Sequence, residues 1–170
     1  MKLTSLLIVG VAFAGMFSLT SVAMARARPR SGATIDVLFD RGLDGMTLNQ
    51  QNQLNQLSDF LEPNLLTQFR RAGYTMKTII SREQFQASPG RFLLIVKTVN
   101  YNPGSKAARM VVGFGAGSTS LDVHFEVYGE DDQPLLSKDH GRRSTLDWQN
   151  VCRALNKDIV RFTGDAVNAR

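Results

Sequence analysis

The sequence has few of the residues that support disulfide, metal or thiol chemistry. It contains one cysteine, Cys152, and two histidines, His124 and His140. A single cysteine excludes an intramolecular disulfide, so the stability of the fold must come from packing. Structural and catalytic metal sites need several nitrogen, sulfur or carboxylate ligands at fixed spacing, and these residues do not supply them. We therefore expect neither a metal nor a cofactor.

Long apolar runs are also absent, except within the first 25 residues. Lys2 provides a positive start, residues 6–19 are nearly uncharged, and residues 23–25 (Ala-Met-Ala) form an A-x-A cleavage signature. This pattern predicts a signal peptide over residues 1–25, since a membrane span needs about 20 apolar residues. No cysteine lies near the cleavage point to carry a lipid. The sequence thus predicts a periplasmic or secreted protein that begins near Arg26 and has no lipid anchor.

The rest of the chain has the length of one compact domain. Residues 26–32 lack hydrophobic periodicity and are interpreted as a flexible basic leader, followed by a single domain over residues 33–170. Basic residues do not alternate with exposed aromatic residues on any strand, and this argues against nucleic-acid binding. The net charge is +5. It indicates either ordinary solvated charge or weak, salt-screened attraction to anionic lipid or cell-wall polymers. The arginines in question are Arg26, Arg28, Arg30, Arg142 and Arg143.

The first half of the domain has the pattern of a strand followed by a helix. Apolar residues alternate from Ala33 to Phe39, which is the period of a half-buried strand. Thr47 and Gln50 form a capping box, and a stripe of leucines at steps of three and four follows. Pro63 interrupts this stripe, so we expect a kink or two consecutive helices near residue 62. Gly73 is expected to end the segment as a left-handed cap.

The second half predicts antiparallel strands and a final helix. Strands are expected at residues 74–81, 92–99, 121–127 and 135–139, with a further short strand possible at 107–112. The strand at 92–99 is apolar on both faces and is predicted to lie at the centre of the sheet. Caps within residues 144–147 start the last helix, and Thr163-Gly164 is expected to end or fray it. The order β-α-β-β-β-β-α predicts an α+β fold: a mixed, mainly antiparallel sheet with two main helices on one face.

A glycine-rich segment over residues 113–120 is the most distinctive motif. Closely spaced glycines let backbone amides approach a phosphate. However, no Lys-Ser/Thr follows the last glycine, and a strand rather than a helix comes next. We interpret the segment as a hairpin tip or a bulged strand whose apolar residues contact either a partner or the core of the domain itself. The expected partner contact residues are Val112, Gly113, Phe114, Gly115, Ala116 and Gly117.

Catalytic residues are harder to assign. His124 is on the outward phase of a strand, His140 lies in a charged run, and no short motif joins either residue to Cys152. The cysteine falls on a predicted amphipathic helix, where burial is its expected role. The alternative to a binding domain is a small periplasmic hydrolase or ligand-binding enzyme that uses His124 or His140 in a pocket between helix and sheet.

The segment over residues 101–136 resembles a bacterial envelope family, domain of unknown function 4410. The residues that carry this resemblance are Pro103-Gly104-Ser105, the run 108–117 and the alternating strand 121–127. The resemblance implies a mixed α/β layout and export, often with a lipid anchor that this chain lacks the cysteine to attach. It implies no catalytic residues. The leading hypothesis is a non-enzymatic periplasmic domain that binds another envelope protein through the glycine-rich loop and the neighbouring strand edge.

Overall fold

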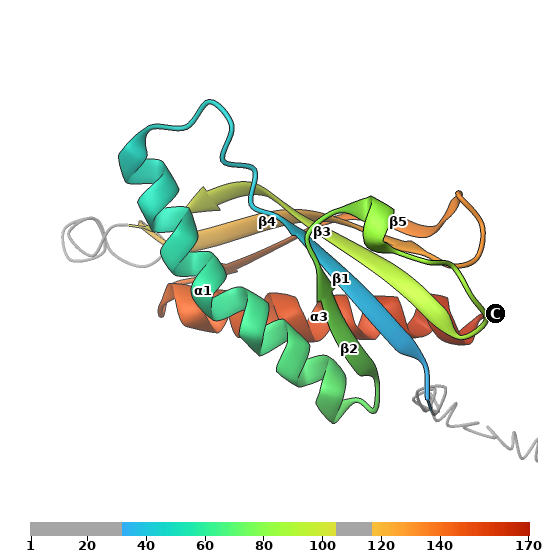
Figure 1. Ribbon diagram of the computed structural model, residues 1–170. Helices are drawn as coiled ribbons and strands as arrows, with labels where there is room; N and C mark the ends of the chain where they lie inside the picture. The colour runs from blue at the N-terminus through green and yellow to red at the C-terminus, as the bar shows by residue number, and fades with distance from the viewer. Residues whose placement is uncertain (1–31, 105–116) are drawn as a thin grey trace, which may run out of the picture.

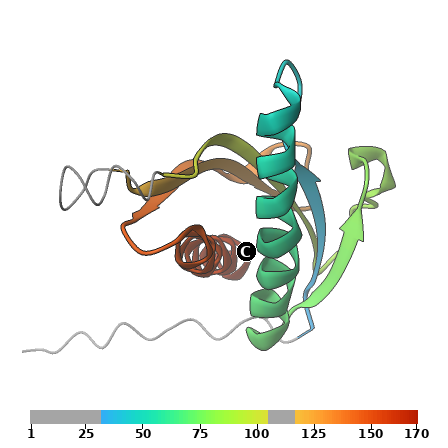
Figure 2. The same cartoon turned by 90° about the vertical axis from the view of Figure 1, so that its left-hand side faces the viewer.

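In the described part of the chain five strands form one sheet, and both long helices lie against the same face of it (Figures 1 and 2). The computed structural model describes residues 32–104 and 117–170. The elements in chain order are β1 (Thr34–Asp40), α1 (Leu48–Arg71), β2 (Thr75–Ile79), the 3-10 helix η1 (Arg82–Gln84), β3 (Arg91–Asn102), β4 (Thr119–Tyr128), β5 (Pro134–Ser144) and α3 (Trp148–Asn168).

The strands are arranged in the order β2-β1-β3-β4-β5, so β3 lies at the centre as its two apolar faces predict. β1 is parallel to both β2 and β3, whereas β3, β4 and β5 are joined antiparallel. The parallel pair β1–β2 is possible because α1 provides the crossover connection between them. The predicted α+β architecture and element order are confirmed. The possible strand at residues 107–112 falls outside the described part of the chain.

α1 begins and ends where the sequence predicts. Thr47 is the N-cap, and its capping box with Gln50 is formed. At the other end, Gly73 has φ of 93° and donates its N–H to the Arg70 carbonyl at 3.0 Å, and the Tyr74 N–H reaches the Phe69 carbonyl at 3.1 Å. These two bonds form a Schellman cap, which needs a left-handed residue at the glycine position.

The expectation of two consecutive helices near residue 62 is wrong. α1 is a single helix from Leu48 to Arg71, with Pro63 inside it. A proline removes one backbone donor and costs about 3 kcal/mol in a helix interior. Leu61 and Leu65, on either side of the proline, are 3% and 0% exposed. Burial of these leucines between the sheet and α3 offsets the local cost, since tertiary packing supplies most of the stability of a helix.

The main core lies between the sheet and the two helices. Alternate residues of the central strands, including Val37, Leu94 and Phe125, point into it and are completely buried. Leu65 of α1 and Ile159 of α3 are equally buried on the helix side. Neither long helix is apolar enough along its length to cross a membrane, within the described residues.

A smaller cluster covers the opposite face of the sheet. Ile79, Leu93 and Tyr128 are buried there, and Phe85 from the β2–β3 connection packs over them. This cover explains why β3 is apolar on both faces at its start. The connection projects from the face that the helices leave free (Figure 2).

α3 continues past the predicted stop at Thr163-Gly164, so that prediction is wrong. The helix runs to Asn168 because Thr163 and Val167 are both completely buried in the final turns. Gly164 has a packing role instead, since a Cβ at this position would lie 3.1 Å from the Tyr74 hydroxyl. Propensity alone therefore placed the end of α3 too early, because tertiary packing overrides the weak preference of one glycine.

Candidate functional site

The two ends of the connection between β3 and β4 (residues 103–118, called the β3–β4 loop) form a tightly packed base. Gly104 and Gly117 have φ of 72° and 69°, a region that favours glycine. A Cβ on Gly104 would lie less than 3.0 Å from the carbonyl oxygen of Gly117, so the two backbones approach closely. The Thr119 hydroxyl, 1% exposed, donates to the Pro103 carbonyl at 2.9 Å. The two ends of the loop are thus held together by contacts that larger residues would prevent.

Only one of the six predicted partner contact residues belongs to this base within the described part of the chain. Gly117 is described and belongs to the base of the loop. The other five, from Val112 to Ala116, fall outside the described residues. Their exposure therefore remains a prediction.

β5 and the start of α3 lie beside the base of the loop. In the sheet register Thr119 is opposite Ser144, and Ser120 is opposite Arg143. Two residues beyond Ser144, the Leu146 side chain is 71% exposed. The loop end of the sheet therefore presents a large apolar side chain and an exposed arginine.

His124 and His140 cannot share one catalytic site, because they point to opposite faces of the sheet. His140 is paired with the core residue Val123 and lies on the helix face, whereas His124 is paired with Asp139 on the other face. Cys152 is completely buried, and burial raises the pKa of its thiol to about 12. A triad of these three residues is excluded, and the predicted burial of Cys152 is confirmed.

His124 is enclosed by carboxylates on two strands. Asp139 Oδ1 lies 2.8 Å from His124 Nδ1, and Glu126 Oε1 and Ser137 Oγ each lie 3.4 Å from Nε2. The hydrogen bond to Asp139 is the main reason that the pKa of His124 is raised above its usual range, with Glu126 contributing. In turn, hydrogen bonds from Tyr128 and then His124 lower the pKa of Glu126, although burial opposes this. The cluster favours an imidazolium held between two carboxylates.

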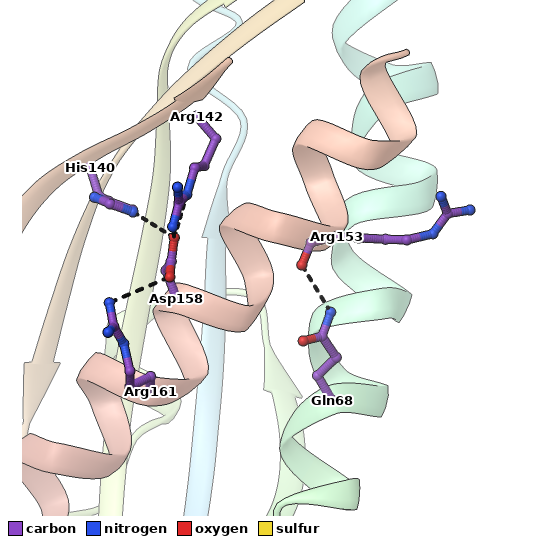
Figure 3. Close-up of polar contacts among 6 residues, drawn as sticks. All are labelled: Gln68, His140, Arg142, Arg153, Asp158 and Arg161. Atoms are coloured by element: carbon purple, nitrogen blue, oxygen red, sulfur yellow. Dashed lines mark hydrogen bonds and ion pairs between the residues drawn. The ribbon is translucent and has the colours of Figure 1, made fainter. Parts of the chain in front are cut away.

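His140 belongs to a second cluster, which joins β5 to α3 (Figure 3). Its Nε2 lies 2.9 Å from Asp158 Oδ2, Arg142 pairs with the same oxygen, and Arg161 reaches Oδ1 at 3.4 Å. Burial opposes ionisation of Asp158, but the hydrogen bonds from His140 and Arg142 outweigh it and lower its pKa. Arg142, one of the arginines expected to attract anionic polymers, is thus paired with Asp158, and the expected attraction stays a prediction.

No group of three potential metal ligands occurs among residues 32–104 and 117–170. The acidic turn after β4 contributes an ion pair, because Arg170 approaches Asp131 at 3.4 Å. A cavity of about 320 Å³ next to this pair is lined by residues from three segments of the chain, among them Arg91 and Leu135.

A larger groove, which the sequence reasoning missed, runs along the contact of α1 with α3. Its volume is about 600 Å³, and it is lined by Asn64, Gln68, Arg71, Ala72, Arg153, Lys157 and Val160. The only signal in the sequence is that Arg153 and Lys157 are four residues apart and thus share one helix face. Arg71 joins them only because the two helices pack side by side, which no local pattern predicts.

Comparison with solved structures finds similar folds at low sequence identity, of which three are described. The PelC dodecamer from Paraburkholderia phytofirmans is 13% identical, with 85% of this chain and 91% of that chain covered and a TM-score of 0.45. A variant of that dodecamer is 9% identical, with 83% and 90% covered and a TM-score of 0.41. A putative neuraminyllactose-binding hemagglutinin homolog from Helicobacter pylori is also 9% identical, with 83% and 90% covered and a TM-score of 0.30.

No curated protein matches the chain. One family model matches residues 32–145, which is more than half of the sequence and contains all five strands, α1 and the glycine-rich loop. The protein therefore belongs to the family described as Domain of unknown function (DUF4410).

Proposed function

We propose that this protein is exported to the periplasm, loses its leader near Ala25, and binds another envelope protein through the β3–β4 loop without catalysing a reaction. The leader pattern of residues 1–25 supports the export step. The compactness of the loop base supports the binding step, and it is the single observation that carries the proposal.

A loop binds more tightly when it loses less conformational entropy on binding. Fixing the two ends of the loop before it binds reduces this loss. The close approach of Gly104 to Gly117 fixes the ends here, and the hydrogen bond from Thr119 to the Pro103 carbonyl reinforces it. Phe114 lies in the second half of the loop sequence and supplies an aromatic side chain, the kind that dominates binding energy at interfaces.

The surroundings of the loop also suit a protein partner. Arg143 near the end of β5 is exposed, and Leu146, which follows β5 in the chain, is 71% exposed. An apolar centre with a polar, charged rim is the usual composition of a protein interface. Arg143 also supports weak attraction to anionic envelope polymers, because it is exposed and forms no ion pair within the described residues, whereas Arg142 pairs with Asp158.

Hydrolysis is the second candidate function, because Asp139, His124 and Ser137 have the connectivity of a catalytic triad. Two features weaken this candidate. Glu126 competes for the same imidazole nitrogen as Ser137, and the raised pKa of His124 favours a protonated ring that cannot accept the serine proton. Neither described cavity is lined by His124 or Ser137. Ester hydrolysis by the purified protein that disappears in Ser137→Ala would support this candidate over the binding domain.

The binding proposal is tested by placing a photo-crosslinking residue at position 114 in whole cells. We expect a defined crosslinked protein, and we expect Phe114→Ser to weaken its capture in a pull-down. Leu48→Ser is the matched control, because Leu48 is 79% exposed at the start of α1, outside the loop. If Phe114→Ser and Leu48→Ser leave the captured partners equally unchanged, the loop is not the contact surface.

Export is tested separately by fractionation and N-terminal sequencing. We expect the protein in the periplasmic fraction with its chain starting near Arg26. Intact precursor in the cytosol would contradict the export step.

A further inference from the structure

The groove between α1 and α3 collects positive charge that no carboxylate among residues 32–104 and 117–170 pairs with. Arg71 comes from the last turn of α1, and Arg153 and Lys157 come from successive turns of α3. No acidic residue lines the groove, and within residues 32–104 and 117–170 none of the three cations forms an ion pair with a carboxylate.

Several other arginines of the domain are paired with a carboxylate. Arg41 meets Glu62 at 2.8 Å, Arg91 meets the buried Asp36 at 2.6 Å, and Arg142 meets Asp158. Three cations without a carboxylate partner in the described part of the chain are therefore gathered in one groove.

Amide side chains at the floor of the groove are held in place by a buried residue. Asn156 is completely buried, and its Nδ2 donates to the Leu61 carbonyl at 2.9 Å and to Asn64 Oδ1 at 3.0 Å. Gln68 Nε2 donates to the same Asn64 oxygen at 2.7 Å and to the Arg153 carbonyl at 3.5 Å (Figure 3). Asn64 Oδ1 therefore accepts two bonds. Its Nδ2 donates none among the described residues, which leaves a donor at the groove.

Arg153 is also positioned rather than free. Its guanidinium lies 5.3 Å from the centre of the Phe60 ring on α1 and bonds to Asn150 and Gln149 on its own helix. A cation that is already ordered loses less entropy on binding a ligand. The groove thus combines one ordered guanidinium, two further cations and an oriented amide.

We propose that this groove binds the phosphate group of a small ligand or lipid headgroup. Hydrogen-bond donors outnumber acceptors among the side chains that line the groove. An oxyanion accepts hydrogen bonds, so it suits such a lining. The combined charge of the three cations is greater than one carboxylate can balance. A phosphate monoester matches it better, because it carries close to two negative charges and three acceptor oxygens. The volume of about 600 Å³ leaves room for the group that bears the phosphate, since ligand sites occupy about 300–1,000 Å³. Ala72 and Val160 supply apolar contacts for that group.

The test is a titration of the purified protein with inorganic phosphate at constant ionic strength, followed by amide chemical shifts. We expect saturable shifts in Asn64, Gln68 and the last turn of α1. Arg71→Gln should weaken binding roughly tenfold, the loss of one charge-assisted hydrogen bond. Arg70→Gln is the matched control, because Arg70 precedes Arg71 on the same helix end but does not line the groove. It should bind as the unmodified protein does.

Two further probes distinguish the source of the phosphate. Glycerol phosphate that binds more tightly than inorganic phosphate, with no binding to phosphatidylglycerol vesicles, would assign a soluble ligand. Vesicle binding that Arg71→Gln weakens and Arg70→Gln does not would assign a lipid headgroup. The inference is overturned if phosphate produces no saturable shifts, or if the two variants affect binding equally. The loop proposal is unaffected by either result, since the groove and the loop share no residue.

Discussion

The carboxylate of Asp158 on α3 lies 2.9 Å from His140 Nε2 on β5, and this contact ties the edge strand of the sheet to the helix beneath it. Arg142 and Arg161 complete the cluster around the same carboxylate. His140, a candidate catalytic residue in the sequence, is thus part of the attachment between β5 and α3.

Asp158→Asn is expected to lower the free energy of unfolding by about 1–3 kcal/mol, because the neutral amide loses charge-assisted bonds to His140 and Arg142. The pKa of Asp158 is lowered in the folded state, so its contribution is present above the unfolded value near 3.9 and is lost as the pH falls through the folded value. Chemical denaturation at neutral pH and below pH 4 measures both effects. Asp132→Asn, at an exposed turn position, is the control and should change little.

His124 should stabilise the fold most in mild acid. Its pKa is raised in the folded state, so its contribution is full below the unfolded value near 6.5 and is lost as the pH rises through the folded value. The imidazole titration is measured by NMR, and Asp139→Asn should bring the pKa back towards its usual range. An unchanged pKa in that variant would show that the hydrogen bond from Nδ1 to Asp139 is not formed in solution.

Gly104→Ala tests the close packing at the base of the loop. The substitution brings a Cβ onto the Gly117 carbonyl and strains a left-handed residue, so we expect a loss of about 2–4 kcal/mol in the free energy of unfolding. Gly90→Ala is the matched control, because Gly90 has φ of 75° but nothing within 4 Å of an added Cβ. The control should lose only about 1 kcal/mol. Equal losses for the two variants would mean that the loop ends are not in close contact.

Thr163→Val is expected to stabilise the protein by about 1 kcal/mol. The Thr163 hydroxyl is buried and has no hydrogen-bond partner among the described residues, and valine has the same shape without the polar atom. Thr119→Val is the contrasting variant, because its buried hydroxyl donates to the Pro103 carbonyl. It should destabilise the protein by about 1 kcal/mol. Thermal unfolding measures both variants: the melting temperature should rise in Thr163→Val and fall in Thr119→Val. A fall in both variants would contradict the absence of a partner for the Thr163 hydroxyl.

The Cys152 thiol should be unreactive in the native protein. It is completely buried and its pKa is raised to about 12, so almost no thiolate is present at neutral pH. A thiol-specific reagent should label the protein only at the rate of unfolding, and labelling should become fast in denaturant. Rapid labelling without denaturant would contradict the burial.

Sequence patterns located most of the elements because the signals that start and end them are local. The capping box at Thr47, the left-handed glycine at 73 and the alternation from Leu121 to Val127 each depend on a few neighbouring residues, and all three are found in the structure. The single helix through Pro63 and the extension of α3 past Gly164 have one cause. At both positions a local helix-breaking preference of a few kcal/mol or less is outweighed by burial of residues that are adjacent on the helix.

The sites divide in the same way. The two histidines, the lone cysteine and the glycine-rich loop were visible as candidates in the chain, because each is rare or distinctive by itself. Their roles depend on partners far away in sequence: Asp158 pairs with Arg142 from 16 residues away, and Asn156 bonds to Asn64 across 92 residues. Such pairs form only when α3 packs against β5 and α1. The sequence determines which side chains are present. The distances between them, and therefore their ion pairs and hydrogen bonds, are determined by the packing of the helices on the sheet.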